Sequence, residues 1–222
     1  MCGRFVRSSP IERLVTEFGL KQARLEMPAA YNIAPSEGIV IIRHSGEKQL
    51  VTCRWGFIPS WANDPSIGHK MINARAETVA SKPVFRSAFL KHRCLVVADG
   101  FYEWQKMRDK KKPFYVRLTS GRPFGFAGLY STCAPADGEK ICTCTIITTG
   151  ANELLKPVHD RMPVIIPKDR EDLWLDPAVQ DPDVLRDMLR PYPSEEMELH
   201  EVSAKINSPR YNAPDAIIQL EG

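Results

Sequence analysis

The first five residues, MCGRF, place a cysteine directly after the initiator methionine. Removal of Met1 would leave Cys2 with a thiol and a primary α-amine on adjacent carbons. An α-amine has a reference pKa near 7.8, so about 14% of it is neutral at pH 7, against roughly 0.04% of a lysine amine. Such a terminus can attack an amide carbonyl with its thiol, or capture an aldehyde as a Schiff base that the thiol closes into a thiazolidine. Cys2 is therefore the first candidate nucleophile, although a residue at a chain end ordinarily frays in solvent.

Three further side chains offer the acid–base and positioning groups that this chemistry needs. Asn73 lies in MINARAET, Glu103 in VVADGFYEW and His159 in KPVHDRMPVII. Glu103 alternates with Phe101 on an apolar strand, so partial desolvation should raise its pKa and suit it to donate protons. His159 can act as an acid or a base near neutral pH. Each also has a structural interpretation: a loop hydrogen bond for Asn73, a hairpin lysine partner for Glu103, and a helix C-terminal contact for His159.

Composition places the chain among globular proteins without selecting a partner. Of its 222 residues, 43% are hydrophobic and 26% are charged, and the net charge is +3. This mild basicity is compatible with an anionic partner and does not demonstrate one. The N-terminus has no apolar segment of a signal peptide, and no apolar run reaches the roughly 18 residues of a membrane span. We expect one domain over residues 1–222, located in the cytosol, at the nucleoid or in the nucleus.

The cysteines do not have the spacing of a metal site. They are Cys2, Cys53, Cys94, Cys133, Cys142 and Cys144. There is no CxxC pair and no histidine at zinc-like spacing, so we expect no metal and no other cofactor. Alternation places Cys142, Cys144 and Ile146 on one face of a strand. All the cysteines except Cys2 are interpreted as small core residues in a reducing compartment.

The order of the expected elements indicates an α+β fold. Ser9, Pro10 and Glu12 predict a capping box for a helix over 9–20 that ends near Gly19. Strands are expected at 39–44, 49–55, 94–106 with an interruption at 99–100, 113–118, 124–131 and 141–149. Helical pieces are expected within 73–93, broken at Pro83, and at 151–159, 168–175 and 182–191. Residues 106–112 are interpreted as a solvated hairpin tip. Strands and helices do not alternate regularly, so we predict a strongly bent mixed or antiparallel sheet, barrel-like and flanked by short helices.

Six motifs in this order resemble the SRAP (SOS-response-associated peptidase) family: MCGRF, YNIAP, WGFIPSW, INARAET, ADGFYEW and HDRMP. The resemblance runs from Met1 to about Pro163, with a looser match at VSAKIN. It implies covalent capture of abasic sites in single-stranded DNA, with Cys2 forming a thiazolidine on the ring-opened sugar aldehyde. It further implies self-cleavage before Cys2, a lyase-type reaction, and a compact α+β domain around a barrel-like sheet.

The resemblance also implies roles for individual residues. Asn73 would position the terminus and the opened sugar, and Glu103 would relay protons. His159 would assist opening of the sugar ring and reversal of the crosslink. Binding a single strand without sequence preference needs cations for phosphates and an aromatic or apolar platform for bases. The candidate DNA-binding residues are Arg4, Asn32, Trp61, Arg75, Arg86 and Arg161.

Three other functions are alternatives to this interpretation of the sequence. A class II glutamine amidotransferase also begins Met-Cys-Gly, yet it needs an asparagine–glycine oxyanion pair, and no Asn-Gly occurs in this chain. A module that only binds single strands would not need Cys2, and a protease acting on other proteins is a third alternative. We expect a monomer whose partner is single-stranded DNA with abasic sites.

Overall fold

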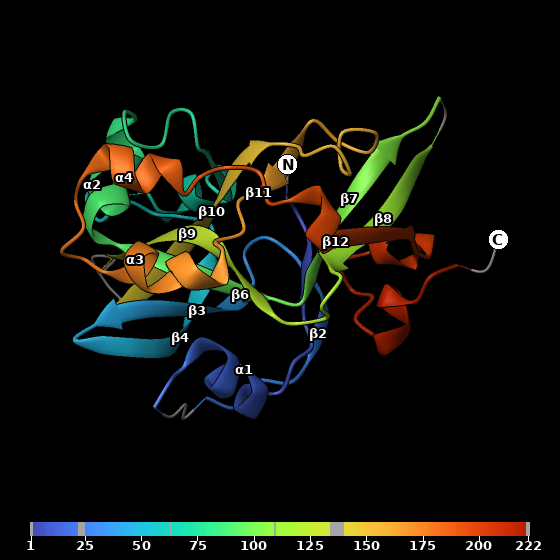
Figure 1. Cartoon of the computed structure of the whole chain (residues 1–222), viewed down its shortest axis with the longest axis horizontal. Coiled ribbons are helices and arrows are strands. Elements are labelled where there is room, and N and C mark those ends of the chain that lie inside the picture. The colour runs from blue at the N-terminus through green and yellow to red at the C-terminus, as the bar shows by residue number, and fades with distance from the viewer. Residues whose placement is uncertain (1, 22–24, 63, 109, 134–139, 221–222) are drawn as a thin grey trace.

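The computed structural model describes residues 2–21, 25–62, 64–108, 110–133 and 140–220 (Figure 1). Its strands are β1 (Phe5–Arg7), β2 (Ala30–Ile33), β3 (Gly38–Ser45), β4 (Glu47–Trp55), β5 (Asn73–Arg75), β6 (Arg93–Ala98), β7 (Gly100–Lys106), β8 (Lys111–Leu118), β9 (Phe124–Cys133), β10 (Ile141–Gly150), β11 (Arg161–Pro163) and β12 (Met197–Glu201). The α-helices are α1 (Ile11–Phe18), α2 (Pro83–Lys91), α3 (Glu171–Leu175) and α4 (Pro182–Asp187). Short 3₁₀ helices include η1 (Pro65–Lys70) and η4 (Ala204–Asn207).

One sheet closes on itself. It runs in the order β11-β10-β4-β3-β6-β9, and β9 also pairs with β10, so that β10, β4, β3, β6 and β9 form a closed ring. β10 is parallel to β4 and to β5 and antiparallel to β9, which makes the sheet mixed. Closure leaves no free edge within the ring. The predicted α+β class with a bent, barrel-like mixed sheet is confirmed.

The second sheet carries the N-terminal strand. Its order is β12-β8-β7-β1-β2, and every pair in it is antiparallel. β1 lies between β2 and β7, with Phe5 opposite Phe101. β7 and β8 extend beyond the body of the molecule as a two-stranded arm at the right of Figure 1. The interruption expected near Gly100 is present, because β6 ends at Ala98 and β7 begins at Gly100 on the other sheet.

Alternating residues of the barrel strands build two hydrophobic clusters. Val40 and Ile42 of β3 belong to the cluster that includes the buried faces of α1, α2, α3 and α4. Ile39 and Ile41 belong to the cluster that joins the barrel to the second sheet, where Phe5 lies at its centre. The Phe5 ring lies 5.2 Å from the ring of Trp55 and 5.9 Å from that of Phe126. β1 is thus held by side-chain packing on both its neighbours and the barrel.

The expected capping box of α1 is wrong. The N-cap residue is Pro10, which has no side-chain cap. The Ser9 hydroxyl instead donates to Asp99 at 2.5 Å, and Asp99 also accepts the backbone N–H groups of Ser8 and Ser9. The predicted C-terminus of the helix is confirmed: Gly19 adopts φ +60°, the left-handed conformation that glycine tolerates best at this position.

The helix expected over 151–159 is also wrong. The segment forms consecutive hydrogen-bonded turns. The side-chain oxygen of Asn152 accepts the backbone N–H of Leu155, a local bond that competes with a helix. Pro157 has no N–H to continue a helical hydrogen-bond pattern. By contrast α2 begins at Pro83, and the expected helices at 168–175 and 182–191 appear as α3 and α4.

Two cysteines that we expected to be reduced form a disulfide. Parallel pairing of β4 with β10 sets Arg54 opposite Thr143, which brings the preceding residues Cys53 and Cys142 to a Cα–Cα distance of 4.7 Å. They are 89 residues apart in the chain, so spacing alone could not pair them. Cys142, Cys144 and Ile146 do lie against one cluster, as alternation predicted. No helix among the described residues is long and apolar enough to cross a membrane.

Candidate active site and nucleic-acid interface

Cys2 lies three residues before β1 and is completely buried. It belongs to the cluster between the two sheets, so it does not fray in solvent. Burial raises the pKa of the Cys2 thiol, and the nearby charge of Glu103 raises it further. A hydrogen bond from the backbone of Arg4 acts in the opposite direction and is smaller. The thiol is therefore protonated at neutral pH in the unprocessed chain.

Asn73 holds the backbone of Cys2. It begins β5, which pairs with β10 so that Asn73 lies beside Ile146. The Nδ2 group of Asn73 donates a hydrogen bond of 2.8 Å to the carbonyl oxygen of Cys2. Its Oδ1 atom is buried and has no hydrogen-bond partner among the described residues. Leaving a buried acceptor unpaired is unfavourable, so this oxygen is suited to receive a donor from a substrate or from an amine at Cys2.

Glu103 is buried on β7 with 2% of its surface exposed. Burial raises the pKa of its carboxyl group, and a positive charge on the nearby His159 ring would oppose that shift. A carboxyl group with a raised pKa is a better proton donor near neutral pH. Its burial excludes the interpretation of Glu103 as an exposed strand residue.

His159 lies in the turn that precedes β11. The backbone N–H of Arg161 donates to Nδ1 of His159 at 2.9 Å. In this arrangement Nδ1 is an acceptor, so the neutral ring carries its proton on Nε2. The carboxylate of Asp160 lies 3.0 Å from the same nitrogen.

These groups converge at one place. Glu103 and His159 line a hollow of about 610 Å³ with Trp104, Asn207 and three lysines of the β7–β8 hairpin. The side-chain amide of Gln105 donates to the carbonyl of Pro157 at 3.0 Å, which ties β7 to the turn that carries His159. Cys2 belongs to the same site, because its thiol lies close enough to Glu103 for the two groups to interact electrostatically and its carbonyl accepts the Asn73 hydrogen bond. The structure therefore brings together all four residues that the sequence proposed for catalysis.

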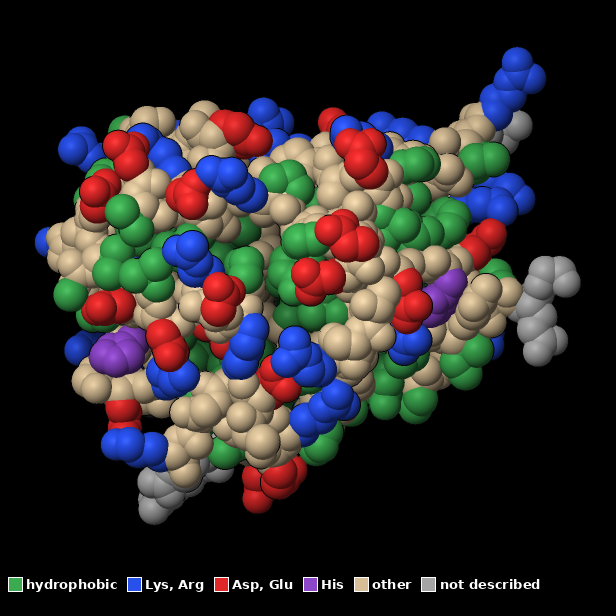
Figure 2. All heavy atoms as spheres, viewed as in Figure 1, with side chains coloured by type: hydrophobic (Ala, Val, Ile, Leu, Met, Phe, Trp, Pro, Cys, Tyr) green, Lys and Arg blue, Asp and Glu red, His purple; other side chains and the backbone are tan. Residues whose placement is uncertain are grey.

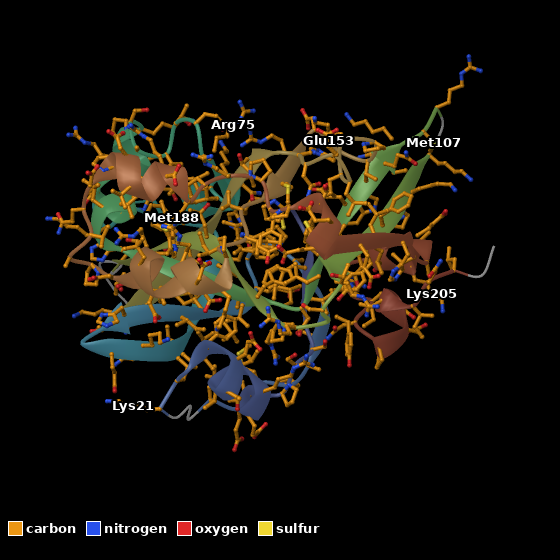
Figure 3. The ribbon with its side chains drawn as sticks, viewed as in Figure 1. Lys21, Arg75, Met107, Glu153, Met188 and Lys205 are labelled. Atoms are coloured by element: carbon orange, nitrogen blue, oxygen red, sulfur yellow. A yellow bond between two sulfur atoms is a disulfide. The ribbon has the colours of Figure 1, made fainter. Side chains whose placement is uncertain are left out.

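The predicted DNA-binding arginines differ in their availability. Arg75 and Arg86 are exposed, and Arg75 stands at the upper rim of the molecule in Figure 3. Arg161 is mostly buried: its guanidinium donates to both carboxylate oxygens of Glu77, at 2.5 and 3.1 Å, and to the carbonyl of Thr148 at 2.6 Å. The Arg161 hydrogen bonds lower the pKa of Glu77. Sequence reasoning missed Glu77, although it lies in the same INARAET motif as Arg75.

Asn32, which we expected to contact DNA, is buried and hydrogen-bonded within the protein, and its contact with DNA stays a prediction. It is 3% exposed, and its Nδ2 group donates to the carbonyls of Ile206, Ser208 and Tyr211. Its Oδ1 accepts a hydrogen bond of 2.9 Å from Nη1 of Arg4. These hydrogen bonds connect Asn32 to the C-terminal segment and to Arg4.

Trp61 is the largest exposed hydrophobic side chain of the described residues, with 66% of its surface accessible. It follows β4 and lines a hollow of about 390 Å³ with Asp64, Ile67 and Lys70. An exposed indole beside a lysine offers a flat apolar platform next to a positive charge.

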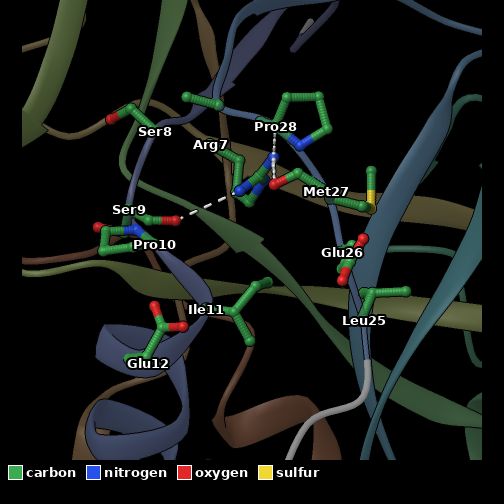
Figure 4. Close-up of a pocket in the computed structure, with 11 residues that line it drawn as sticks. Arg7, Ser8, Ser9, Pro10, Ile11, Glu12, Leu25, Glu26, Met27 and Pro28 are labelled. Carbon is green, nitrogen blue, oxygen red and sulfur yellow. Dashed lines mark hydrogen bonds between the residues drawn. The ribbon is translucent and has the colours of Figure 1, made fainter.

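A larger hollow of about 1160 Å³ lies at the other end of β1, beside the start of α1 (Figure 4). Arg7 is 2% exposed there and donates to the carbonyl of Ser9 at 3.3 Å and to the carbonyls of Met27 and Pro28. The guanidinium thus ties the segment before β2 to β1. None of the four proposed catalytic residues lines this hollow.

Comparison with known proteins gives a family. The family model described as SOS response associated peptidase (SRAP) matches residues 1–209. The Bacillus subtilis protein named abasic site processing protein YoqW is 45% identical over 98% of this chain and 99% of its own length. The chicken protein named abasic site processing protein HMCES is 32% identical over 100% of this chain and 78% of its own length.

The fold has solved counterparts. A crystal structure of a Bacteroides thetaiotaomicron protein superimposes with a TM-score of 0.90 at 27% identity and covers 99% of this chain and all of its own. A Bordetella bronchiseptica structure matches with a TM-score of 0.79 at 29% identity over 91% of this chain and all of its own. The family match, the relatives and the shared fold agree with the six motifs: this chain belongs to the SOS response associated peptidase family.

Proposed function

We propose that this protein captures abasic sites in single-stranded DNA covalently, through Cys2 after removal of Met1. Its relatives are named abasic site processing proteins. The observation that carries the proposal is the Asn73 hydrogen bond to the Cys2 carbonyl, which fixes the terminal backbone beside Glu103. A fixed terminus next to a buried acid is what condensation of an amine with an aldehyde requires.

The reaction balances without a cofactor. The α-amine of Cys2 adds to the aldehyde carbon of the opened sugar, and loss of one water gives a Schiff base. Because the water leaves with a proton from Glu103, the Schiff base is protonated; the thiol sulfur adds to its carbon, the nitrogen keeps its one hydrogen and becomes neutral, and a five-membered thiazolidine closes. Protonated Glu103 donates the proton with which the hydroxyl leaves as water, and its carboxylate takes the thiol proton at ring closure. No electrons are gained or lost.

The environment of the thiol favours the amine as the first nucleophile. Burial raises the pKa of the Cys2 thiol, so the thiolate that a cysteine amidohydrolase needs is scarce in the unprocessed chain at neutral pH. The α-amine has its reference pKa near neutrality. An amine-first route therefore fits this site better than thiol-first attack on glutamine.

The other residues of the site have separate roles in this proposal. The unpaired Oδ1 of Asn73 accepts from the new amine or a sugar hydroxyl. His159, with its proton on Nε2, assists opening of the sugar ring and, as a lyase-type step, reversal of the crosslink. Exposed Arg75 contacts a phosphate. Hydrolysis of the Met1–Cys2 bond by the protein itself is proposed as a second activity of the same groups.

A denaturing gel tests the function. The processed protein should form a heat- and detergent-stable adduct with a single strand carrying one abasic site, and none with the same strand lacking it. A form with a retained N-terminal tag keeps the Cys2 thiol but not its primary amine, so it should still bind strands and fail to make the adduct. Mass spectrometry establishes each terminus. Adduct formation at full rate by the blocked form would overturn the mechanism, and retention without any adduct would favour the module that only binds DNA.

A further inference from the structure

The lysines of the β7–β8 hairpin belong to the catalytic hollow. From the sequence, residues 106–112 are interpreted as a solvated tip. In the structure Lys106, Lys110 and Lys111 line the same hollow as Glu103 and His159. All three lysines are exposed, and Figure 2 shows Lys and Arg side chains on the projecting end of this hairpin.

The strand register places like charges face to face. Lys106 of β7 lies directly opposite Lys111 of β8. Directly opposed like charges on one face of an antiparallel pair destabilise the hairpin. None of the three lysines has an ion-pair partner among the described residues, whereas the adjacent Lys112 pairs with Glu201 at 2.8 Å. An anion between these lysines would relieve a repulsion that the folded protein leaves in place.

The base of the hairpin is fixed on both sides of the site. Gln105 is bonded to Pro157 of the turn that carries His159. The indole N–H of Trp104 donates to Oδ1 of Asn207, in η4, at 2.7 Å. The hairpin that carries the lysines is therefore anchored at its base, beside the reacting groups.

We propose that Lys106, Lys110 and Lys111 clamp the phosphates of the DNA strand on one side of the abasic nucleotide. This inference rests on the proposed function. It extends the proposed DNA-binding site along the strand on one side of the abasic nucleotide only. Lys106 lies three residue steps after Glu103 on β7, a span of about 10 Å at the rise of an antiparallel strand. A stacked strand advances about 3.4 Å per nucleotide. The lysines thus face the first few nucleotides beyond the abasic site, while Arg75 is carried by a separate strand, β5, at the edge of the barrel sheet.

Salt-dependent binding to a defined strand tests the clamp. The probe is a labelled single strand with a stable abasic analogue that has no aldehyde, so only noncovalent binding is measured. Each phosphate contact on a single strand contributes about 0.7 to the log–log slope of affinity against salt. Replacing the three lysines with glutamine should lower that slope by about 2, and replacing them with arginine should restore it.

A matched triple variant controls for general loss of charge. Lys21, Lys91 and Lys140 are exposed, and none of them lines the hollow; their replacement with glutamine should leave the slope nearly unchanged. Melting temperatures report folding: the hairpin variant should be at least as stable as the original, because opposed like charges have been removed.

One-sided strands test the direction. Two strands are compared, one with the abasic analogue at its 5′ end and one with it at its 3′ end. Replacing the three lysines should lower the salt slope with one of these strands and leave it unchanged with the other. An effect with both strands, or a slope change no larger than that of the control variant, would overturn the clamp. The unmodified protein is also scored for adduct on a true abasic strand. Failure there counts against the proposed function, whereas an unchanged slope beside normal adduct formation counts against the clamp alone.

Discussion

Asn73→Ala asks whether the terminal backbone must be held for capture to occur. The Asn73 amide donates a 2.8 Å hydrogen bond to the Cys2 carbonyl. Removing one partner of such a partly buried bond costs about 1–3 kcal/mol, because the remaining carbonyl is left unpaired. At 1.4 kcal/mol for each factor of ten, loss of this positioning should slow adduct formation by about 5- to 150-fold.

The assay is a single-turnover time course of adduct on denaturing gels, at protein concentrations that saturate the abasic strand. Asn73→Asp is the matched variant, since it keeps the size of the side chain and replaces the N–H donor with an oxygen facing the Cys2 carbonyl. It should lose at least as much rate as the alanine variant. If both variants react at the original rate while their melting temperatures fall, Asn73 supports the fold and does not position the nucleophile.

Two further changes separate chemistry from binding. Glu103→Gln should slow adduct formation and leave affinity for intact strands nearly unchanged; a large loss of affinity with normal crosslinking kinetics would contradict the proton-relay role. Burial raises the folded-state pKa of Glu103, so its contribution to stability is fully present below its unfolded pKa of about 4.3 and is lost as pH rises through the folded-state pKa. Glu103→Gln should therefore melt higher than the original protein at about pH 7, and the difference should disappear near pH 3.5, as measured by thermal melting. Arg75→Ala should weaken binding to abasic and intact strands alike and lower the salt slope by about 0.7; an unchanged slope would give Arg75 a structural role.

Short sequence patterns correctly predicted those helices and strands that are determined by residues within the element itself. The β7–β8 hairpin follows from alternation on both sides of a charged turn, and the end of α1 follows from Gly19. The predictions failed where a residue distant in the sequence determined the hydrogen bonding or pairing of a local side chain. Asp99, 90 residues away, takes the Ser9 hydroxyl that would have capped α1. The Cys53–Cys142 disulfide likewise depends on a parallel strand pairing that no short pattern displays.

The candidate site shows the same division. Cys2, Asn73, Glu103 and His159 could be proposed from motifs, because the chemistry needs those residue types. Where each side chain points could not be read from the sequence. Arg161 is bound to Glu77, and Asn32 is enclosed by the C-terminal segment. Both partnerships depend on tertiary contacts.

The position of Cys2 depends on strand β1 as well as on contacts of the cysteine itself. A chain terminus is ordinarily the most mobile part of a protein, and ordering it at the moment of reaction would cost conformational entropy. Here Phe5 is fully buried between Trp55 and Phe126, and Asn73 holds the Cys2 carbonyl. Folding therefore orders Cys2, the residue that would be terminal after removal of Met1, before any substrate arrives. In the proposed function, a short strand that anchors its own first residues would hold the amine and thiol of a processed Cys2 as a preorganised pair, which is the condition for two successive attacks on one aldehyde carbon.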